Sequence, residues 1–247
     1  MKNLAAVEED RSFFLGMAGI FVLVMLVGFG PTYFWRWSHP HALIAAPPEP
    51  FFYAIHGVLM TLWLLLVFLQ SALIRWGLPK LHRQLGLLSS LLAIGVVGVG
   101  LEATHLAVVR CSGFFHGPPG ALAFAINPLS DLLRFVPLFL AGLLMRRNRA
   151  AHQRLMLLAS LVLLHPAVAR CPLPVIQGAR FWVDYPLADL ALLLLLLPLL
   201  LYDGLTLKRV HPVTMLAGGL VVVVIAVRPL VDQSDLWLGM ARVLTWS

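Results

Sequence analysis

Long apolar runs alternate with short polar stretches along almost the whole chain, and seven of them are long enough to suggest membrane spans. A helix needs roughly 20 residues to cross a hydrocarbon core about 30 Å thick. The predicted spans are residues 13–35, 51–74, 85–109, 121–145, 152–169, 182–202 and 211–231. Each is expected to be helical, because lipid offers no partner to unpaired backbone groups and no alternating barrel pattern appears.

The first and last apolar segments need separate interpretation. The first run exceeds the roughly 7–15 apolar residues of a cleavable signal peptide, so we expect it to remain as the first span. After the seventh run, residues 235–247 mix Leu, Trp, Met and Val with Asp235 and Arg242. This mixture predicts a short helix that lies in the membrane interface.

Composition supports a protein of the bilayer. Of the 247 residues, 60% are hydrophobic and 12% are charged, whereas roughly a quarter of the residues in soluble domains are charged. No room is left for a separate soluble domain, so residues 1–247 are predicted to form a single transmembrane domain. The predicted fold class is an all-α polytopic transmembrane helix bundle with about seven spans.

Lysine and arginine gather at alternate connections between the spans, eleven on one side and six on the other. By the positive-inside rule, the N-terminus is predicted to be cytoplasmic and the C-terminus external. The lysines and arginines that give the net charge of +7 flank the spans and do not form a stripe with interleaved aromatics. The expected partners are therefore the lipid bilayer and its anionic headgroups, and nucleic acid is not expected.

Two of the predicted spans open with near copies of one sequence. His82-Arg-Gln-Leu-Gly-Leu-Leu-Ser-Ser-Leu-Leu92 and His152-Gln-Arg-Leu-Met-Leu-Leu-Ala-Ser-Leu-Val162 are identical at six of eleven positions. A weaker third copy begins at His211-Pro212. All three open spans that run from cytoplasm to exterior, which predicts a repeated helix hairpin of parallel sense, unlike an inverted transporter repeat. Chance similarity between leucine-rich segments is the alternative.

Several motifs together resemble a group of uncharacterised bacterial multi-pass inner-membrane proteins. The motifs are Phe13-Phe-Leu-Gly-Met17, Gly28-Phe-Gly-Pro-Thr-Tyr33, His56-Gly-Val-Leu-Met-Thr-Leu-Trp63, Leu81-His-Arg-Gln-Leu-Gly86, His152-Gln-Arg-Leu-Met-Leu-Leu-Ala159, His211-Pro212 and Arg228-Pro-Leu230. The resemblance covers nearly the whole chain and implies a seven-helix fold and an inner-membrane location. It carries over no activity.

Ionisable residues near the external ends of the spans suggest a metal site. Glu102 and His105 are three residues apart, which places a carboxylate and an imidazole on one helix face, as in di-metal bundle proteins. The chain has no second Glu-x-x-His pair, so a mononuclear site of histidines and a carboxylate is the form considered. The candidate metal ligands are His56, Glu102, His105, Asp131 and His165.

The same histidines are candidates for axial ligation of b-type haem, in which imidazoles from two helices hold one iron. An external haem would use His56 with His165 or His105, and a cytoplasmic haem would use His82 with His152. Structural interpretations compete with these, because a histidine after a basic loop also meets lipid headgroups or caps a helix.

Other polar residues also have structural interpretations. Asp131 and Arg134, three residues apart, can neutralise each other, and Asp189 or Asp203 can pair with Arg228 or Lys208 across the bundle. The only two cysteines, Cys111 and Cys171, both fall on the predicted external side, so a disulfide between them is an alternative to two free thiols.

No Walker loop, Ser-His-Asp order, Cys-x-x-Cys or dinucleotide fingerprint appears in the sequence, so whether the protein is an enzyme is left open. Three functions remain as hypotheses. The first is electron transfer or redox chemistry with haem b or a transition metal, with a quinone as a potential partner. The second is a non-catalytic accessory subunit that binds the other subunits of a larger membrane complex. The third is transport of a small solute or proton, with Glu102, Asp131 and His165 as relays.

Overall fold

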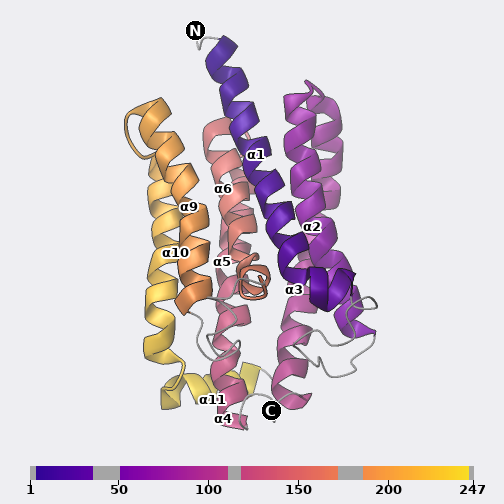
Figure 1. The fold of residues 1–247 in the computed structure, drawn as a ribbon, viewed down its shortest axis with the longest axis vertical. Coiled ribbons are helices and arrows are strands. Elements are labelled where there is room, and N and C mark those ends of the chain that lie inside the picture. Colours follow the sequence, from indigo (N-terminus) through magenta and orange to yellow (C-terminus); the bar gives the residue numbers. More distant parts are fainter. Residues whose placement is uncertain (1–3, 36–50, 111–117, 172–185, 245–247) are drawn as a thin grey trace.

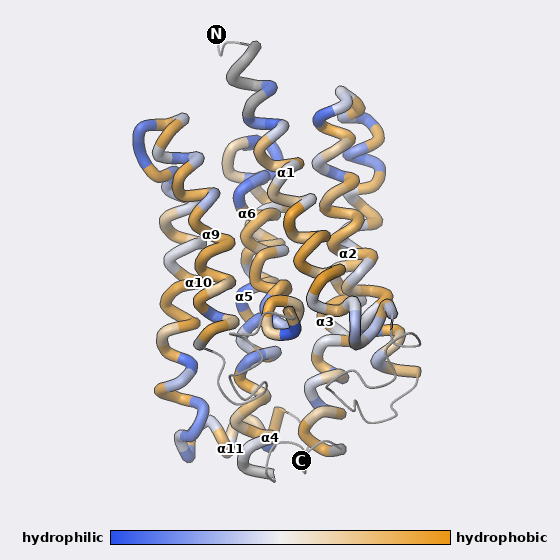
Figure 2. The backbone as a smooth tube through the Cα atoms, in the orientation of Figure 1, coloured by the Kyte–Doolittle hydropathy of each residue, from blue (hydrophilic) through white to orange (hydrophobic). Residues whose placement is uncertain are grey.

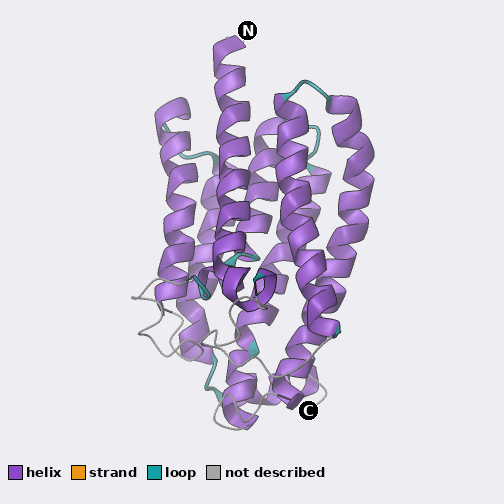
Figure 3. Ribbon diagram, turned by 45° about the vertical axis from the view of Figure 1, so that its right-hand side comes forward, coloured by secondary structure: helices purple, strands orange, loops and turns teal. Residues whose placement is uncertain are grey.

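The computed structural model describes residues 4–35, 51–110, 118–171 and 186–244. In this part of the chain every regular element is a helix, and most of the helices run roughly along the long axis of the molecule (Figures 1 and 3). The fold class predicted from the apolar runs, an all-helical bundle, is therefore confirmed for the described residues.

The N-terminal part consists of one long helix followed by a hairpin. The elements are α1 (Leu4–Phe29), the π-helical turn η1 (Gly30–Phe34), α2 (Phe52–Arg75) and α3 (Pro79–Arg110). The turn between α2 and α3 includes Gly77, whose φ of 76° lies in the left-handed region that glycine adopts without a steric penalty. Only a few residues are therefore needed to reverse the chain after α2.

The middle part contains a second hairpin. Its elements are α4 (Pro118–Phe124), α5 (Ile126–Leu144), α6 (Arg149–Val162) and α7 (His165–Val168). The side chain of Asn148 accepts a hydrogen bond of 3.2 Å from the backbone N–H of Ala151, as an N-cap residue does, and so fixes the start of α6.

The C-terminal part contains a third hairpin and a final short helix. Its elements are α9 (Pro186–Leu207), α10 (Pro212–Val231) and α11 (Asp235–Leu244). The predicted interfacial helix corresponds to α11, which packs against α4 through the buried side chains of Ala241 and Ala121. The indole N–H of Trp237 donates a 3.0 Å hydrogen bond to the carbonyl of Leu122 and holds the two short helices together.

Six described helical segments are long and apolar enough to cross a membrane: Asp10–Phe29, Phe52–Arg75, Pro79–Val109, Gly120–Leu144, Leu187–Leu207 and Pro212–Val231. The predicted span at 152–169 instead forms α6 and α7, separated by a turn. With 14 residues, α6 is about 21 Å long, shorter than a hydrocarbon core of about 30 Å. A seventh full span is therefore not found among the described residues.

The interruption after α6 has a local cause. Pro166 has no backbone N–H and cannot continue the hydrogen-bond ladder of α6, whereas it fits the first turn of a new helix. Leu164 instead donates its N–H to Leu161 over 3.0 Å and accepts the N–H of Ala167 over 2.9 Å. Figure 1 shows α7 nearly end-on at mid-height of the bundle, so the chain changes direction inside the protein.

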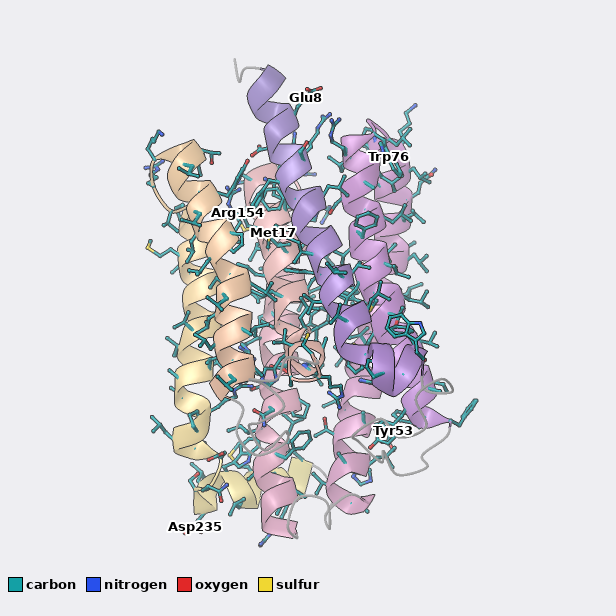
Figure 4. The ribbon with its side chains drawn as sticks, viewed as in Figure 1. Glu8, Met17, Tyr53, Trp76, Arg154 and Asp235 are labelled. Atoms are coloured by element: carbon teal, nitrogen blue, oxygen red, sulfur yellow. The ribbon has the colours of Figure 1, made fainter. Side chains whose placement is uncertain are left out.

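The three hairpin turns lie at one end of the bundle, together with the start of α1, and α4 and α11 lie at the other (Figure 1). Trp76 and Glu8 mark the first end and Asp235 marks the second in Figure 4. The turn end is hydrophilic in Figure 2, and its turns are rich in exposed arginine and lysine. These exposed cations are Arg75, Lys80, Arg83, Arg146, Arg147, Arg149, Lys208 and Arg209.

The core is apolar and centred on α6. Leu158 and Val162 are fully buried, and Trp63 from α2 packs edge-on against Phe135 of α5 with ring centroids 5.1 Å apart. By contrast, the outward faces of α2, α3, α9 and α10 expose large aliphatic side chains such as Leu91 and Leu216. An apolar exterior around a packed interior is the pattern expected of a protein surrounded by lipid.

Candidate functional site

Five ionisable side chains from four helices meet in the interior. They are Asp131 and Arg134 of α5, His165 of α7, Asp189 of α9 and Arg228 of α10, and we call them the charge cluster. Arg134 is 1% exposed, His165 2%, and Asp131 and Arg228 4% each, so the cluster is almost completely shielded from the surroundings. Buried charges at membrane depth are costly and are by default candidates for a functional site.

Each aspartate of the charge cluster is paired with a guanidinium. Asp131 accepts a hydrogen bond from Arg134 of the same helix, and Asp189 accepts one from Arg228 of the neighbouring helix. The Nη1 atom of Arg228 also lies 3.8 Å from the Oδ1 atom of Asp131, which connects the two pairs. The predicted pairing of Asp189 with Arg228 is confirmed, as is that of Asp131 with Arg134.

His165 lies between the two aspartates. Its Nδ1 atom is 3.6 Å from Oδ2 of Asp131, and its Nε2 atom is 3.2 Å from Oδ1 of Asp189. The turn that ends α6 places the imidazole here, because His165 is the first residue of α7. Both ring nitrogens therefore lie within 4 Å of a carboxylate oxygen.

The two arginines of the charge cluster are held differently. Arg134 also donates to the backbone carbonyls of Ser130 over 3.2 Å and Val221 over 3.5 Å. In Arg228, the buried Nε and Nη1 atoms have no hydrogen-bond partner among the described residues. Buried guanidinium donors are normally satisfied, so these two atoms are exceptions among the described residues.

The charges of the cluster balance without the histidine. Two carboxylates and two guanidiniums sum to zero, so the protonation state of His165 sets the net charge of the cluster at zero or plus one. In a low-dielectric interior this difference strongly affects which ions and protons the site accepts.

A second buried ion pair lies nearer the end with the hairpin turns. Arg154 of α6 donates through Nε to Oδ1 of Asp203 on α9 over 3.0 Å, and the backbone N–H of His211 donates to Oδ2 of the same aspartate, also over 3.0 Å. The guanidinium lies 5.7 Å from the ring centre of Phe14 on α1. Figure 4 shows Arg154 on this upper part of α6. The pair ties α6 to α9 and the start of α10, which is a structural role.

The two repeat histidines also come together, close to the same end. The rings of His82 and His152 have centroids 6.3 Å apart and are nearly perpendicular, at 89°. The Nδ1 atom of His82 lies 3.3 Å from the carbonyl oxygen of Gln70, and that of His152 lies 2.7 Å from the carbonyl oxygen of Gly142. Each histidine thus contacts the preceding helix of its own hairpin. We call these two residues the histidine pair.

The proposed external metal and haem ligands do not gather into one site. Within the described ranges, no three His, Cys, Asp or Glu side chains are arranged to hold a metal ion. Asp131 and His165 are brought together, but Arg134 and Asp189 already occupy them. Among the described residues, the five predicted ligands are therefore not gathered into one metal-binding group.

The remaining predicted ligands lie on α2 and α3. The buried Nδ1 atom of His56 has no hydrogen-bond partner among the described residues. Glu102 and His105 are half-buried on α3. An external haem between His56 and His165 would need the imidazole of His165 to leave both carboxylates.

Of the two cysteines in the predicted disulfide, Cys111 lies outside the described residues. The thiol of Cys171 lies 3.6 Å from the carbonyl oxygen of Ala167, and burial raises its pKa above the ordinary value.

From the sequence, Asp189 and Arg228 were assigned only to structural pairing, and Arg134 to pairing with Asp131 or to contact with haem propionates, although all three complete the charge cluster. The signal that could have identified them was their charge itself, since each lies within a predicted apolar span.

Comparison with protein-family models, curated proteins and solved structures gives no match.

Proposed function

We propose that this protein transports protons across the membrane and that the charge cluster is its proton-binding site. The observation that carries the proposal is the position of His165, whose two ring nitrogens face Asp131 Oδ2 at 3.6 Å and Asp189 Oδ1 at 3.2 Å. A membrane location in turn agrees with the six apolar helices.

A neutral imidazole cannot satisfy both of these contacts. It has one N–H donor and one lone pair, and a lone pair that faces a carboxylate oxygen is repelled. One additional proton, on the imidazole or shared with either aspartate, removes the repulsion. Since the paired arginines already balance the two aspartates, the cluster can gain or lose this proton without unpairing them.

The interrupted helix supports movement of the proton. Non-helical backbone inside a membrane protein is tolerated where it is buried in protein or lines a polar cavity, and interrupted helices often form transport sites. The turn before His165 interrupts the helix at the cluster, and the two donors of Arg228 without a hydrogen-bond partner among the described residues belong to the same cluster. A rigid ion-pair lock would need neither feature.

The proposal is tested with purified protein in liposomes that contain a pH-sensitive dye, with a potassium diffusion potential as the driving force. Wild-type protein is expected to admit protons. His165→Gln and Asp189→Asn, which keep the approximate side-chain shapes, are expected to reduce the initial rate by about tenfold or more, as removal of a positioned proton-transfer group does.

Asp235→Asn is the matched control, because this exposed aspartate lies on α11, away from the charge cluster. It should conduct as wild type does. Only variants with the wild-type elution volume and circular dichroism are compared. Wild-type rates equal to those of empty liposomes, or equal rates in both cluster variants and wild type, would overturn the proposal, and the first of these results favours the accessory-subunit hypothesis.

A further inference from the structure

We propose that the histidine pair, His82 and His152, binds one b-type haem as its two axial ligands. The inference is independent of the charge cluster, because none of the five side chains of that cluster takes part in it. It rests on the tautomer, the spacing and the number of the imidazole ligands, and on the charges around them.

The backbone contacts determine which ring nitrogen is available. A carbonyl oxygen only accepts hydrogen bonds, so Nδ1 of His152 carries the proton where it lies beside Gly142. Nδ1 of His82 lies 3.3 Å from the carbonyl oxygen of Gln70 and, in the haem-bound state, donates to it in the same way. The lone pair is then on Nε2. A metal-binding histidine is usually prepared in this way, with its other nitrogen donating to a carbonyl or carboxylate that fixes the ring orientation.

The spacing fits two ligands on opposite sides of one metal. A metal–nitrogen bond of about 2 Å and a further distance of about 1 Å to the ring centre place trans imidazoles about 6 Å apart between centres. The observed separation is 6.3 Å. Two imidazoles at a tetrahedral angle would be closer together, so the spacing favours axial ligation.

The number of ligands selects haem over a bare ion. No third His, Cys, Asp or Glu joins the pair in the described part of the chain, and two imidazoles leave most metal ions with too few ligands. Haem supplies four nitrogens of its own and requires only the two axial positions from the protein.

The surrounding charge fits the haem propionates. Both histidines are half-buried near the end with the hairpin turns, and exposed Arg83 and Arg149 flank them in the sequence. Guanidinium groups bind carboxylates with paired hydrogen bonds. By contrast, Arg154, two residues after His152, is already bound to Asp203.

Gln70 provides an internal check on the tautomer. In the amide orientation that satisfies both its oxygen and its nitrogen, the amide nitrogen of Gln70 lies 2.7 Å from Nδ1 of His82 and donates to it. In the haem-free protein the ring proton of His82 is then on Nε2, and haem ligation requires it to move to Nδ1. Gln70→Leu removes this competing donor. The haem-bound state is therefore expected to be kept or strengthened in this variant.

The test uses full-length protein purified in detergent and titrated with hemin. We expect saturation at one hemin per chain, a Soret band of six-coordinate haem, reduced α and β bands after dithionite, and a low-spin ferric signal in electron paramagnetic resonance. Iron content and a pyridine haemochrome assay give the stoichiometry.

His82→Ala and His152→Ala are expected to abolish the low-spin spectrum. His56→Ala changes a histidine of α2 outside the pair and is expected to keep the spectrum. His152→Met retains an axial ligand and should restore six-coordinate haem with a higher reduction potential. This rescue separates ligation from a purely structural role of the histidine.

Three results would overturn the inference. The first is hemin binding that is non-saturable. The second is a low-spin spectrum unchanged in both single alanine variants. The third is a colourless protein that takes up copper or zinc but not hemin. Each of these three results can be distinguished from a failure of the proton-transport proposal, because the haem readouts are spectroscopic and need no membrane gradient.

Discussion

Gly28 is the residue at which α1 approaches α7 most closely. A Cβ atom at this position would overlap the backbone carbonyl of Ala167, and backbone cannot move aside as a flexible side chain can. The contact matters for the charge cluster, because Ala167 lies two residues after His165 in the same short helix. Small residues allow such close helix approach in membrane proteins.

Gly28→Ala is therefore expected to destabilise the folded protein by about 1–3 kcal/mol, as overpacking of a tight contact does. The measurement is thermal unfolding in detergent. Gly16→Ala is the matched control, since it lies on the same helix and an added Cβ there meets no atom within 4 Å. The expectation would be contradicted if both substitutions had the same effect on the unfolding temperature.

At the scale of elements, the three hairpins use their first histidine in two ways. In α3 and α6, Nδ1 of the histidine faces a carbonyl of the preceding helix. In α10, His211 is the N-cap, and its Nδ1 accepts a 3.2 Å hydrogen bond from the N–H of Val213. The third copy of the repeat thus has the same position as the others but a different contact. Its Nδ1 accepts a hydrogen bond and must be unprotonated, whereas Nδ1 of the other two lies beside an acceptor.

The capping role of His211 predicts a pH dependence of stability. Burial of the ring, and secondarily the charge of Arg154, lower the pKa of His211 from its ordinary value of 6.5. The unfolded chain takes up the proton near that value while the folded protein resists it, so the stabilising contribution is present above pH 6.5 and is lost as the pH falls toward the lower pKa of the folded state.

His211→Asn keeps a side-chain acceptor at the N-cap but does not titrate in this range. We expect the unfolding temperature of wild type to fall more than that of His211→Asn between about pH 8 and about pH 5. Differential scanning fluorimetry of both proteins in the same buffers measures this difference. Parallel pH curves would show that the imidazole of His211 does not contribute.

Most helices could be predicted from the sequence, because apolar run length and helix formation in lipid are local properties. The described parts of five predicted spans became α2, α3, the pair α4 and α5, α9 and α10 within a few residues. The turn between α6 and α7 was missed, since Leu163 and Leu164 are as apolar as their neighbours and only Pro166 signals the interruption.

The candidate site was less predictable than the helices. The pairs within one helix or between neighbouring helices, such as Asp131 with Arg134 and Asp189 with Arg228, follow from spacing and charge. The position of His165 between them depends on the direction that α7 takes after the turn, and this direction is set by packing against α1 and α9. Periodicity in one segment holds no information about that packing.

At the scale of the whole molecule, the distribution of positive charge is uneven between the two ends. All three hairpin turns, with their exposed arginines and lysines, lie at the end marked by Trp76, and α11 lies at the opposite end (Figure 4). Cationic connections are retained in the cytoplasm during membrane insertion. We therefore expect the Trp76 end to face the cytoplasm and Asp235 to face the exterior.

Cysteine labelling tests this orientation. In a variant whose two native cysteines, Cys111 and Cys171, are replaced by serine, Trp76→Cys or Asp235→Cys introduces one exposed thiol at either end. A membrane-impermeant maleimide is expected to label Asp235→Cys in intact spheroplasts and Trp76→Cys only after the membrane is permeabilised. The reverse pattern would place the histidine pair on the outside. Labelling of both positions in intact spheroplasts would be incompatible with a bundle whose two ends lie on opposite sides of the bilayer.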